Sequence, residues 1–570
     1  MPNKKGRYRS DKWLKNNDIY SWFRRGGFKA QGFSEAAFEG RPLIGICNSW
    51  SELTHCNAHL RQLAEAVRRG VWQAGGFPLE FPVMSLGEYY MLPTTMLYRN
   101  LMSMDVEESI RANPLDGVVL LGGCDKTTPG LLMGAASADV PAIMVTGGPQ
   151  LKGNWRGEEV GSCTDCRRYF ADLRAGTLAA EDWADLQDNI LRSAGHCMVM
   201  GTASTMAVLA EALGIALPGN GAIPAVDSRR LQLAEAAGRK IVELIHEDVP
   251  PSAILTFKAF QNAIRTLHAI GGSTNGIIHL VALAGRVGIE LPLSLFDELS
   301  RTTPFILNLK PSGEFLMEDF FYAGGVSALL SALSPLLHLD VPTVTGQSLG
   351  KNIKKAINHN PELIRSIEKP LHREGGLAVL YGSLAPDGAL IKPTAATPEL
   401  LVHEGQAIVF ENPKEMDKVM MSSDSSIRAE DVLILRNSGP IGGPGMPEWG
   451  WLPLPKYLLE QGVRDMVRVS DARMSGTGFG TVVLHVSPEA SVGGPLAAVK
   501  TGDKIRLDVP NRNLELLVED REIKRRISQV EPVPTGPSRG YEWLYKQHIL
   551  QANQGCDFDF LKAESLKPIE

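Results

Sequence analysis

Hydrophobic positions in the first two thirds of the chain follow two spacings, one typical of strands and one typical of helices. Residues 42–47 form a short apolar run, as a buried strand does, and residues 57–74 then place Leu60, Leu63 and Val67 on one helical face. The same patterns predict strands at 81–84, from Val118 and at 141–145, and helices at 95–111, 203–213, 228–246 and 259–270. This alternation, which continues to about residue 365, predicts an α/β/α domain built on a parallel sheet.

The hydrophobic pattern changes after Gly375 and Gly376. Short apolar runs separated by glycine and proline follow at 377–381, 407–410, 432–435, 482–484 and 505–509. Such runs are typical of a β-barrel or a sandwich. We therefore predict an α/β domain at residues 1–370 and a β-barrel-like domain at residues 371–570. Two domains also suit a chain of 570 residues, which exceeds what one hydrophobic core usually supports.

Composition narrows the class of protein. The 58 Lys and Arg against 64 Asp and Glu give a net charge of −6, and the basic residues are scattered, so nucleic acid is not an expected partner. No apolar stretch approaches the length of a membrane span, and the charged first 20 residues lack the apolar core of a secretory signal. These features predict a soluble, cytoplasmic protein with no membrane partner.

Seven cysteines are an odd set in a long chain, which argues against a secreted disulfide framework. The simplest interpretation of any one cysteine is a small buried hydrophobe, and Cys47 suits a buried strand position. Cys556 is interpreted as a tail residue. Cys163 and Cys166 form a CxxC pair that fits a redox pair, half a zinc site or two surface cysteines without a function. No second CxxC exists in the sequence.

The most informative segment is the apolar run from Gly117 that stops at Gly122-Gly123 and delivers Cys124, Asp125 and Lys126 together. Thr127 or Thr128 followed by Pro129 is typical of a helix N-cap with proline at the first helical position. The three reactive side chains are therefore expected on a strand-to-helix turn. In open α/β sheets such turns lie at the carboxyl edge, where ligands bind.

Cys56 and Cys197 share this local setting, because each precedes a predicted helix, and Asn57 is available as the cap of the helix after Cys56. Helix N-termini stabilise thiolates. Three thiolates suit an iron–sulfur cluster with one open iron position, whereas structural zinc normally takes four closed ligands. The separations of 68 residues (124 − 56) and 73 residues (197 − 124) match no compact ligand motif.

Asp125 and Lys126 also fit a simpler interpretation, in which the carboxylate caps a helix and the amine binds phosphate or faces water. A Mg²⁺ site needs more oxygen ligands, for which Glu88 and Glu448 are candidates. Ser475 lies in a glycine-rich turn at 471–478, where backbone amides could stabilise an alkoxide. Ser475 does not lie in a Gly-x-Ser-x-Gly elbow of the kind that hydrolases use.

Five motifs taken together resemble the dihydroxy-acid and phosphogluconate dehydratase family, and the resemblance covers nearly the whole chain. The motifs are Thr54-His55-Cys56-Asn57, Gly123-Cys124-Asp125-Lys126-Thr127-Thr128-Pro129, Gly195-His196-Cys197-Met198 with Gly201-Thr202-Ala203, Gly271-Gly272-Ser273-Thr274-Asn275 and Asp471-Ala472-Arg473-Met474-Ser475-Gly476. The resemblance implies an active site between an α/β domain and a β-barrel domain, in a homodimer or homotetramer.

Carried over residue by residue, the resemblance implies site residues and cofactors. It implies that Cys56, Cys124 and Cys197 hold a [2Fe-2S] cluster and that Ser475 is the catalytic base, with Thr477 as a substrate contact. It also implies a Mg²⁺ site in which the lysine amine is carboxylated and so becomes an oxygen ligand. The implied Mg²⁺ ligands are Glu88, Asp125, Lys126 and Glu448.

Within the family, the segments at 56–60 and 471–477 are more similar to the sugar-acid (pentonate) dehydratases than to the branched-chain biosynthetic enzymes. Two departures stand out: His55 replaces a common proline, and Cys163 and Cys166 lie in a segment that lacks cysteines in known pentonate enzymes. The resemblance implies dehydration of a small sugar acid to a 2-keto-3-deoxy acid. Alternatives are a branched-chain dihydroxy-acid dehydratase, an enzyme for a phosphorylated substrate, and a non-catalytic iron–sulfur sensor or phosphate-binding module.

Overall fold

The computed structural model describes residues 8–421, 426–530 and 537–563. Its N-terminal half is built on a four-stranded sheet in the order β2-β1-β3-β4, and every neighbouring pair is parallel. The strands are β1 (Leu43–Asn48), β2 (Phe77–Pro82), β3 (Gly117–Gly122) and β4 (Ala142–Thr146). Every residue of β1, β3 and β4 is buried, as expected where helices cover both faces of a parallel sheet. The predicted parallel α/β fold is confirmed.

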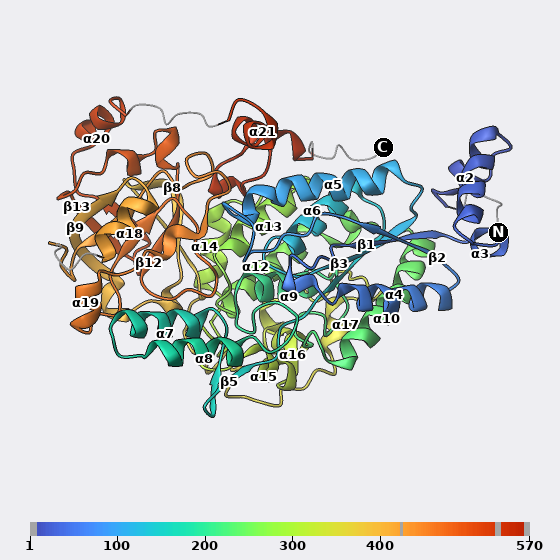
Figure 1. The fold of residues 1–570 in the computed structure, drawn as a ribbon, viewed down its shortest axis with the longest axis horizontal. Helices are drawn as coiled ribbons and strands as arrows, with labels where there is room; N and C mark the ends of the chain where they lie inside the picture. Colours follow the sequence, from blue (N-terminus) through green and yellow to red (C-terminus); the bar gives the residue numbers. More distant parts are fainter. Residues whose placement is uncertain (1–7, 422–425, 531–536, 564–570) are drawn as a thin grey trace.

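Helices form a layer on each face of this sheet (Figure 1). One layer contains α5 (Arg99–Ala112) and α6 (Thr127–Ala138), and the other contains α4 (Leu60–Gln73) and α10 (Ser228–Glu247). The helices α4 and α10 cross so closely that a Cβ added at Gly70 would lie 1.9 Å from the Glu235 carbonyl oxygen. Glycine is therefore required there by the close approach of two backbones.

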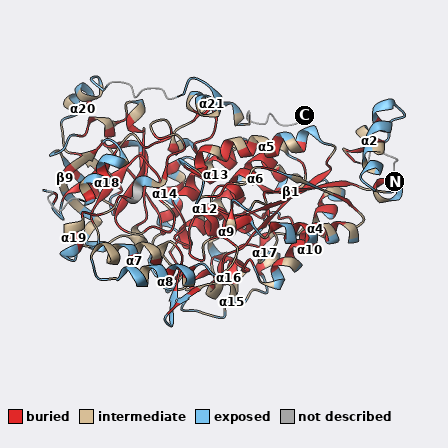
Figure 2. Ribbon diagram, viewed as in Figure 1, coloured by how far each residue is buried: buried red, intermediate tan, exposed pale blue. Residues whose placement is uncertain are grey.

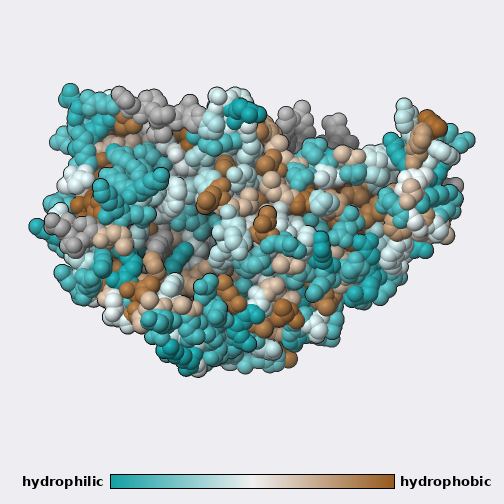
Figure 3. Space-filling model, in the orientation of Figure 1, coloured by the Kyte–Doolittle hydropathy of each residue, from teal (hydrophilic) through white to brown (hydrophobic). Residues whose placement is uncertain are grey.

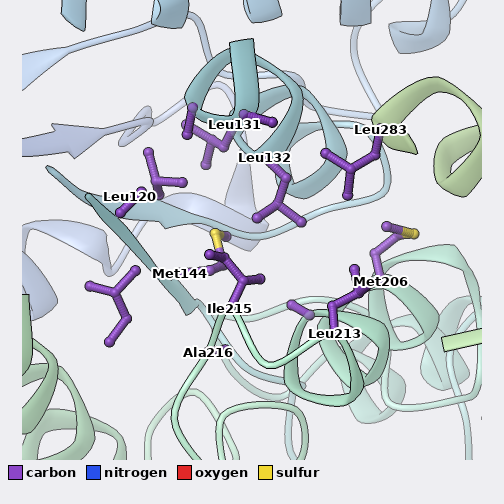
Figure 4. Close-up of a cluster of buried hydrophobic side chains, with 14 of the residues drawn as sticks. Leu120, Leu131, Leu132, Met144, Met206, Leu213, Ile215, Ala216 and Leu283 are labelled. Atoms are coloured by element: carbon purple, nitrogen blue, oxygen red, sulfur yellow. The ribbon is translucent and has the colours of Figure 1, made fainter. Parts of the chain in front are cut away.

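The interior of this half contains helices that are buried over most of their surface. All residues of α9 (Thr202–Ala212) are buried, and α12 (Phe257–Ala269) and α13 (Asn275–Arg286) are buried along most of their length (Figure 2). Figure 4 shows the junction, where Leu120 of β3 and Leu131 of α6 lie in one apolar cluster with side chains from β4, α9 and α13. The core is thus continuous from the sheet to these inner helices.

Three local predictions differ from the structure. The strand expected at 81–84 is β2 and begins earlier, at Phe77. The N-cap of α6 is Lys126 instead of a threonine, so Pro129 lies at the third helical position. Asn57 does not cap α4, whose N-cap is His59. For β2 the boundary is set by pairing with β1, which begins with Leu43 opposite Phe77.

The C-terminal half contains a closed eight-stranded barrel, which confirms the predicted β-barrel. Its strands combine parallel and antiparallel pairs. In barrel order they are β10 (Val432–Leu435), β11 (Arg468–Ser470), β12 (Val482–Ser487), β8 (Ala385–Ile391), β7 (Ala378–Gly382), β14 (Asn513–Leu516), β13 (Lys504–Asp508) and β9 (Val402–Phe410). The division at residue 370 stays a prediction.

The C-terminal segment after the barrel returns to the N-terminal half. It contains α21 (Gly540–His548), which lies near α5 and α13 in Figure 1. The fully buried Arg286 donates to both carboxylate oxygens of Asp557, at 2.6 and 2.9 Å, and Arg99 donates to the Cys556 carbonyl oxygen at 2.6 Å. Cys556 is thus a buried residue that joins the two halves and is not a free tail residue.

A short helical arm projects from the end of the molecule that lies opposite the barrel (Figure 1). Its helix α2 (Ile19–Ala30) exposes Ile19, Tyr20, Trp22 and Phe23, and apolar side chains are visible on the arm in Figure 3. Within the described ranges, no helix combines the length and apolar character needed to cross a membrane.

Candidate active site between the sheet and the barrel

Lys126 lies at the centre of three carboxylates. Its Nζ is 3.0 Å from Glu88, 3.1 Å from Glu448 and 3.5 Å from Asp125, and its side chain is completely buried. Lys126 and Asp125 follow β3 at the carboxyl edge of the sheet, while Glu448 begins the short 3-10 helix η6 (Glu448–Trp451) in the C-terminal half. The structure therefore brings together all four residues predicted for the Mg²⁺ site, from both halves of the chain.

Other polar groups hold these carboxylates in place. Arg473, in the turn before Ser475, donates to Glu448 at 3.1 Å and to the Thr94 hydroxyl at 3.0 Å. The Thr95 hydroxyl donates to Glu88, and the Ala203 backbone N–H donates to Asp125 at 3.2 Å. Because Ala203 lies in the first turn of α9, Asp125 also faces the positive end of that helix dipole.

The charges in this group shift its pKa values in opposite directions. Burial raises the pKa of Asp125 to about 6, although Lys126 opposes the shift. Burial alone would also raise the pKa of Glu448, but the positive charges of Lys126 and Arg473 outweigh it and lower that pKa to about 2. Burial disfavours the Lys126 ammonium, yet the surrounding carboxylates raise its pKa above the ordinary value. The unmodified lysine thus provides the positive charge that a bound cation would otherwise supply.

Replacing this buried cation gives a first prediction. In metal-free protein, Lys126→Met leaves three carboxylates facing one another, and we expect the free energy of unfolding to fall by about 3–5 kcal/mol. The pairing of Lys126 with Glu448 stabilises the fold fully at pH values above 4.5, the ordinary pKa of a glutamate carboxyl. This stabilisation is lost as the pH falls toward about 2, the pKa of Glu448 in the folded protein. The difference between the variant and the parent protein should therefore shrink across that pH window.

Urea denaturation in the presence of a chelator measures this effect. The matched control is Lys258→Met, because Lys258 also pairs with a carboxylate, Asp340, at 3.0 Å, but both side chains are exposed. An exposed pair of this kind contributes less than about 1 kcal/mol. Equal destabilisation by the two substitutions would contradict a buried cation site.

The three thiols predicted as cluster ligands all lie at turns before helices. Cys124 follows β3 and has a left-handed backbone (φ 71°), Cys56 lies in the 3-10 helix η1 (His55–Asn57), and Cys197 precedes α9. The pKa of Cys56 is raised first by its contact with the Cys124 thiol, then by burial, and then by the charges of Cys124 and Cys197. The three thiols are therefore close enough to interact electrostatically.

Asn57 fixes the relation between two of these turns. Its side-chain oxygen accepts a hydrogen bond from the Gly123 backbone N–H at 2.9 Å, and its amide nitrogen donates to the Ser85 hydroxyl at 2.9 Å. The residue that the sequence suggested as a helix cap thus ties the loop of Cys56 to the loop of Cys124. Gly123 leaves little space, because an added Cβ would lie 3.1 Å from the Asn57 oxygen.

A fourth thiol adjoins this group. The Sγ atoms of Cys163 and Cys197 are 3.7 Å apart, and the Tyr89 hydroxyl lies 3.3 Å from the former and 3.6 Å from the latter. The hydrogen bond from Cys197 is the main cause that lowers the pKa of Cys163 to about 7. Cys166 instead packs against the apolar cluster around Trp155 and Tyr169. The structure thus separates the two cysteines of the CxxC motif.

Ser475 and Thr477 lie on the barrel side of the site. Their hydroxyl oxygens are 2.8 Å apart, and the Thr477 backbone N–H donates to Ser475 Oγ at 3.4 Å. Between them, Gly476 passes so close to α9 that an added Cβ would lie 2.8 Å from the Thr202 nitrogen. Asn275 completes the contact, since its side chain donates to Thr202 Oγ1 at 3.0 Å and to the Met474 carbonyl at 3.3 Å. The turn is therefore held against the N-terminal half.

Lys392 is a residue that sequence reasoning missed. It directly follows β8, its side chain is 6% exposed, and its Nζ has no hydrogen-bond partner within the described part of the chain. Burial lowers its pKa to about 7. It lines a cavity of about 10 Å³ together with Ser475, and no other residue lining this cavity is charged. The available signal was a lysine directly after the apolar run Ala389-Leu390-Ile391.

A larger cavity of about 740 Å³ adjoins the site between α7 (Thr164–Arg174) and the barrel. Five arginines line it against three acidic residues, which favours an anionic molecule. One of them, Arg167, also acts on the site, because its charge contributes to the lowered pKa of Glu448. Arg167 and Arg473 are further site residues that the sequence did not single out for a role.

The arrangement offers two kinds of donors to cofactors. The thiols are soft ligands that suit iron, and the carboxylates are hard ligands that suit Mg²⁺. As the side chains stand, no three His, Cys, Asp or Glu residues of the described ranges form a group that could hold a metal ion. Lys126 instead lies between the carboxylates. The ligand assignments for Cys56, Cys124, Cys197, Glu88, Asp125, Lys126 and Glu448 thus stay predictions.

Comparison with known families covers nearly the whole chain. A family model described as "Dihydroxy-acid/6-phosphogluconate dehydratase N-terminal" matches residues 41–352. A second model, described as "Dihydroxy-acid/6-phosphogluconate dehydratase C-terminal", matches residues 362–556. The two matches correspond to the sheet half and the barrel half.

Curated relatives match the chain from end to end. The chain is 52% identical to L-arabinonate dehydratase from Rhizobium leguminosarum bv. trifolii, over 97% of this chain and 96% of the relative. It is 53% identical to L-arabonate dehydratase from Azospirillum brasilense, over 98% and 97% respectively. It is 47% identical to 6-deoxy-6-sulfo-D-gluconate dehydratase from Pseudomonas putida, again over 98% and 97%.

Proposed function

Because the chain belongs to the dihydroxy-acid/6-phosphogluconate dehydratase family and is therefore a hydro-lyase, we propose that it dehydrates a sugar acid, a pentonate, to a 2-keto-3-deoxy acid. Relatives named for arabinonate and arabonate, at 52% and 53% identity over nearly the full length, support this substrate class. The observation that carries the proposal is the convergence of Lys126, three carboxylates, the thiols and Ser475 from both halves of the chain.

The donor sets fit the cofactors of the proposal. Cys56, Cys124 and Cys197 would hold a [2Fe-2S] cluster, and Glu88, Asp125, Glu448 and a carboxylated Lys126 would hold Mg²⁺. When bound, these groups would supply Lewis-acid stabilisation of the substrate's carboxylate and hydroxyl oxygens. Carboxylation suits the observed site, because it would convert the amine at the centre of the three carboxylates into a further oxygen ligand.

Ser475 is the base that takes the C2 proton in this proposal. Its oxygen accepts a hydrogen bond from the Thr477 backbone N–H at 3.4 Å and lies 2.8 Å from the Thr477 hydroxyl oxygen, and both groups would donate to an alkoxide. The amides of the turn and the packing of Gly476 on α9 fix its position. Arg473 orients Glu448, and the arginines of the neighbouring cavity would attract the acidic substrate.

In this proposal Lys392 accepts the Ser475 proton before the substrate reacts, through one water molecule in the cavity that both residues line. The cavity volume of about 10 Å³ is near the lower limit for one water. A neutral amine is required, and the pKa of about 7 keeps much of the group neutral at physiological pH. A serine activated by a lysine is an established arrangement in other enzymes.

This role predicts a pH profile. Protonation of Lys392 below its pKa of about 7 should reduce kcat/KM about tenfold per pH unit. Lys392→Met should lower kcat by about 10²-fold and remove this acid limb. The substitution should not destabilise the protein. Between pH 7 and 10.5, the ordinary pKa of a lysine, the Lys392 amine binds fewer protons in the folded state than in the unfolded state. The buried amine therefore opposes folding at neutral pH, and its removal costs no stability. An unchanged acid limb in the variant would refute the role.

A keto-acid assay on anaerobically prepared protein tests the function. The substrates are aldonates of four to six carbons, 2,3-dihydroxyisovalerate and 6-phosphogluconate. We expect the highest kcat/KM with a pentonate. A preference for 2,3-dihydroxyisovalerate would assign the chain to branched-chain biosynthesis, and protein that carries iron and Mg²⁺ but forms no keto acid would indicate a sensor.

Light scattering tests the proposed homodimer or homotetramer, and cell fractionation tests the proposed cytoplasmic location.

A further inference from the structure

Cys163 has no role in the proposed function, yet it lies at the site and not at the surface. It immediately precedes α7, and its Sγ is 3.7 Å from that of Cys197. The Tyr89 hydroxyl contacts both sulfur atoms, at 3.3 and 3.6 Å. Cys163 therefore faces one of the three thiols assigned to the cluster.

The distance between these two sulfur atoms matches a pair of thiolates on one metal. Two thiolates on a tetrahedral metal, each about 2.3 Å from it, are about 3.8 Å apart. The Cys56 and Cys124 thiols also interact, because the Cys124 thiol is the first cause that raises the pKa of Cys56. The four thiols thus form two pairs, Cys56 with Cys124 and Cys163 with Cys197. Two pairs are the donor set of a cluster that contains two irons.

We propose that Cys163 is a fourth thiolate ligand of the iron–sulfur site, on the iron held by Cys197, and that it leaves this position when substrate binds. The proposal rests on the proposed function in that Cys197 is a cluster ligand and a pentonate is the substrate. It assigns a chemical role to a cysteine that the resemblance leaves unexplained, and it distinguishes Cys163 from Cys166.

The surroundings of Cys163 link it to the substrate side of the site. The Thr164 hydroxyl donates to the Thr477 carbonyl oxygen at 2.9 Å. A movement of the Ser475 turn would therefore be transmitted to Thr164, the residue directly after Cys163. On the other side, Asp165 accepts hydrogen bonds from the Gly161 backbone N–H at 2.6 Å and from Lys310 at 2.7 Å. The loop is therefore anchored on both sides of a half-buried thiol.

The replacement of the Cys163 sulfur by a substrate oxygen involves no change of oxidation state. Cys163 releases its proton to solvent when its sulfur binds iron. When substrate arrives, the sulfur–iron bond breaks, a substrate hydroxyl oxygen takes the vacated position, and the Cys163 sulfur takes up a proton. No oxidant or reductant is needed, and both electrons of the broken bond stay on sulfur.

Spectroscopy of the holoenzyme tests the assignment with two matched variants of the full chain, Cys163→Ala and Cys166→Ala. We expect Cys163→Ala to shift the visible absorption and circular dichroism of the cluster and the g-values of its reduced form, whereas Cys166→Ala should leave them unchanged. A pentonate added to the parent protein should move its spectra toward those of Cys163→Ala. In air, Cys163→Ala should lose its cluster about tenfold faster than the parent protein, because substitutions that weaken a metal site typically lower metal affinity by about tenfold or more.

Alkylation followed by mass spectrometry gives a test that needs no variant. In the parent holoenzyme, iodoacetamide should label Cys163 slowly without substrate and several times faster with saturating pentonate, with Cys166 as the internal reference. Equal labelling with and without substrate would overturn the proposal. So would identical spectra of Cys163→Ala and the parent protein, even if cluster-free protein forms a Cys163–Cys197 disulfide.

The outcomes separate this inference from the proposed function. Protein that binds iron and makes keto acid, but whose spectra do not respond to Cys163→Ala, supports the function and overturns only the fourth ligand. Protein that binds no iron overturns both. Protein that shows the spectral shift but makes no keto acid keeps the ligand and overturns the dehydratase assignment.

Discussion

Ser475→Ala should lower kcat for the sugar acid by about 10²–10⁴-fold, the usual contribution of a positioned base. The substitution removes the only hydroxyl proposed to take the C2 proton. It should leave the fold intact, because among the described residues that hydroxyl bonds only to the Thr477 hydroxyl and backbone N–H, within its own turn. Initial rates of keto-acid formation measure the effect, together with iron and Mg²⁺ content.

The matched control for this prediction is Ser470→Ala in β11. Ser470 is also buried, and its hydroxyl accepts a hydrogen bond from the Ala472 backbone N–H at 3.0 Å, which gives it a structural contact but no place in the site. We expect its rate to stay within a few-fold of the parent rate. If Ser475→Ala kept more than a tenth of the activity with full cofactor content, another group would have to be the base.

Cys124→Ser should abolish both cluster binding and activity. The substitution replaces a soft thiolate by a harder oxygen ligand that binds iron poorly, and it does so at the turn that also carries Asp125 and Lys126. We expect purified protein without the visible absorption of an iron–sulfur cluster, with iron reduced to background and with no keto-acid formation. The measurements are iron and sulfide content, visible absorption and the rate with a pentonate.

Cys47→Ala is the control for the loss of a buried thiol. Cys47 lies in β1, in the same sheet, and it is completely buried among apolar residues. Its removal leaves a small cavity and should lower stability, while iron content and activity stay close to the parent values. Full iron content in Cys124→Ser would contradict the ligand assignment, and iron loss in Cys47→Ala would show that the assay reports misfolding.

The architecture was predictable because the hydrophobic pattern is local. Apolar runs such as residues 42–47, together with an amphipathic segment at 57–74, gave a strand and a helix within a few residues of β1 and α4. Boundaries were less predictable. Phe77 begins β2 earlier than its pattern indicates, and Lys126, not a threonine, caps α6, because contacts with other elements determine where each one ends.

Most of the candidate site was also visible in the sequence. Cys124, Asp125 and Lys126 are adjacent residues on a strand-to-helix turn, and the parallel sheet brings such turns to one edge. Glu448 and Ser475 were candidates from their local sequence, but only the resemblance linked them to this site, since nothing in their local sequence shows that they face that edge. Arg473 and Lys392 were missed because an arginine in a turn and a lysine after a strand are ordinary residues until their burial is known.

By itself, the sequence determined the two kinds of fold, the turns that carry the reactive side chains and the family of the enzyme, because these depend on local periodicity and on motifs of adjacent residues. Only the tertiary structure decided which groups meet. It surrounds Lys126 with carboxylates from both halves, leaves Lys392 buried without a partner in the described residues, and pairs Cys163 with Cys197 instead of Cys166. Such contacts join residues far apart in the chain, so the packing of the sheet against the barrel, not spacing along the sequence, sets them.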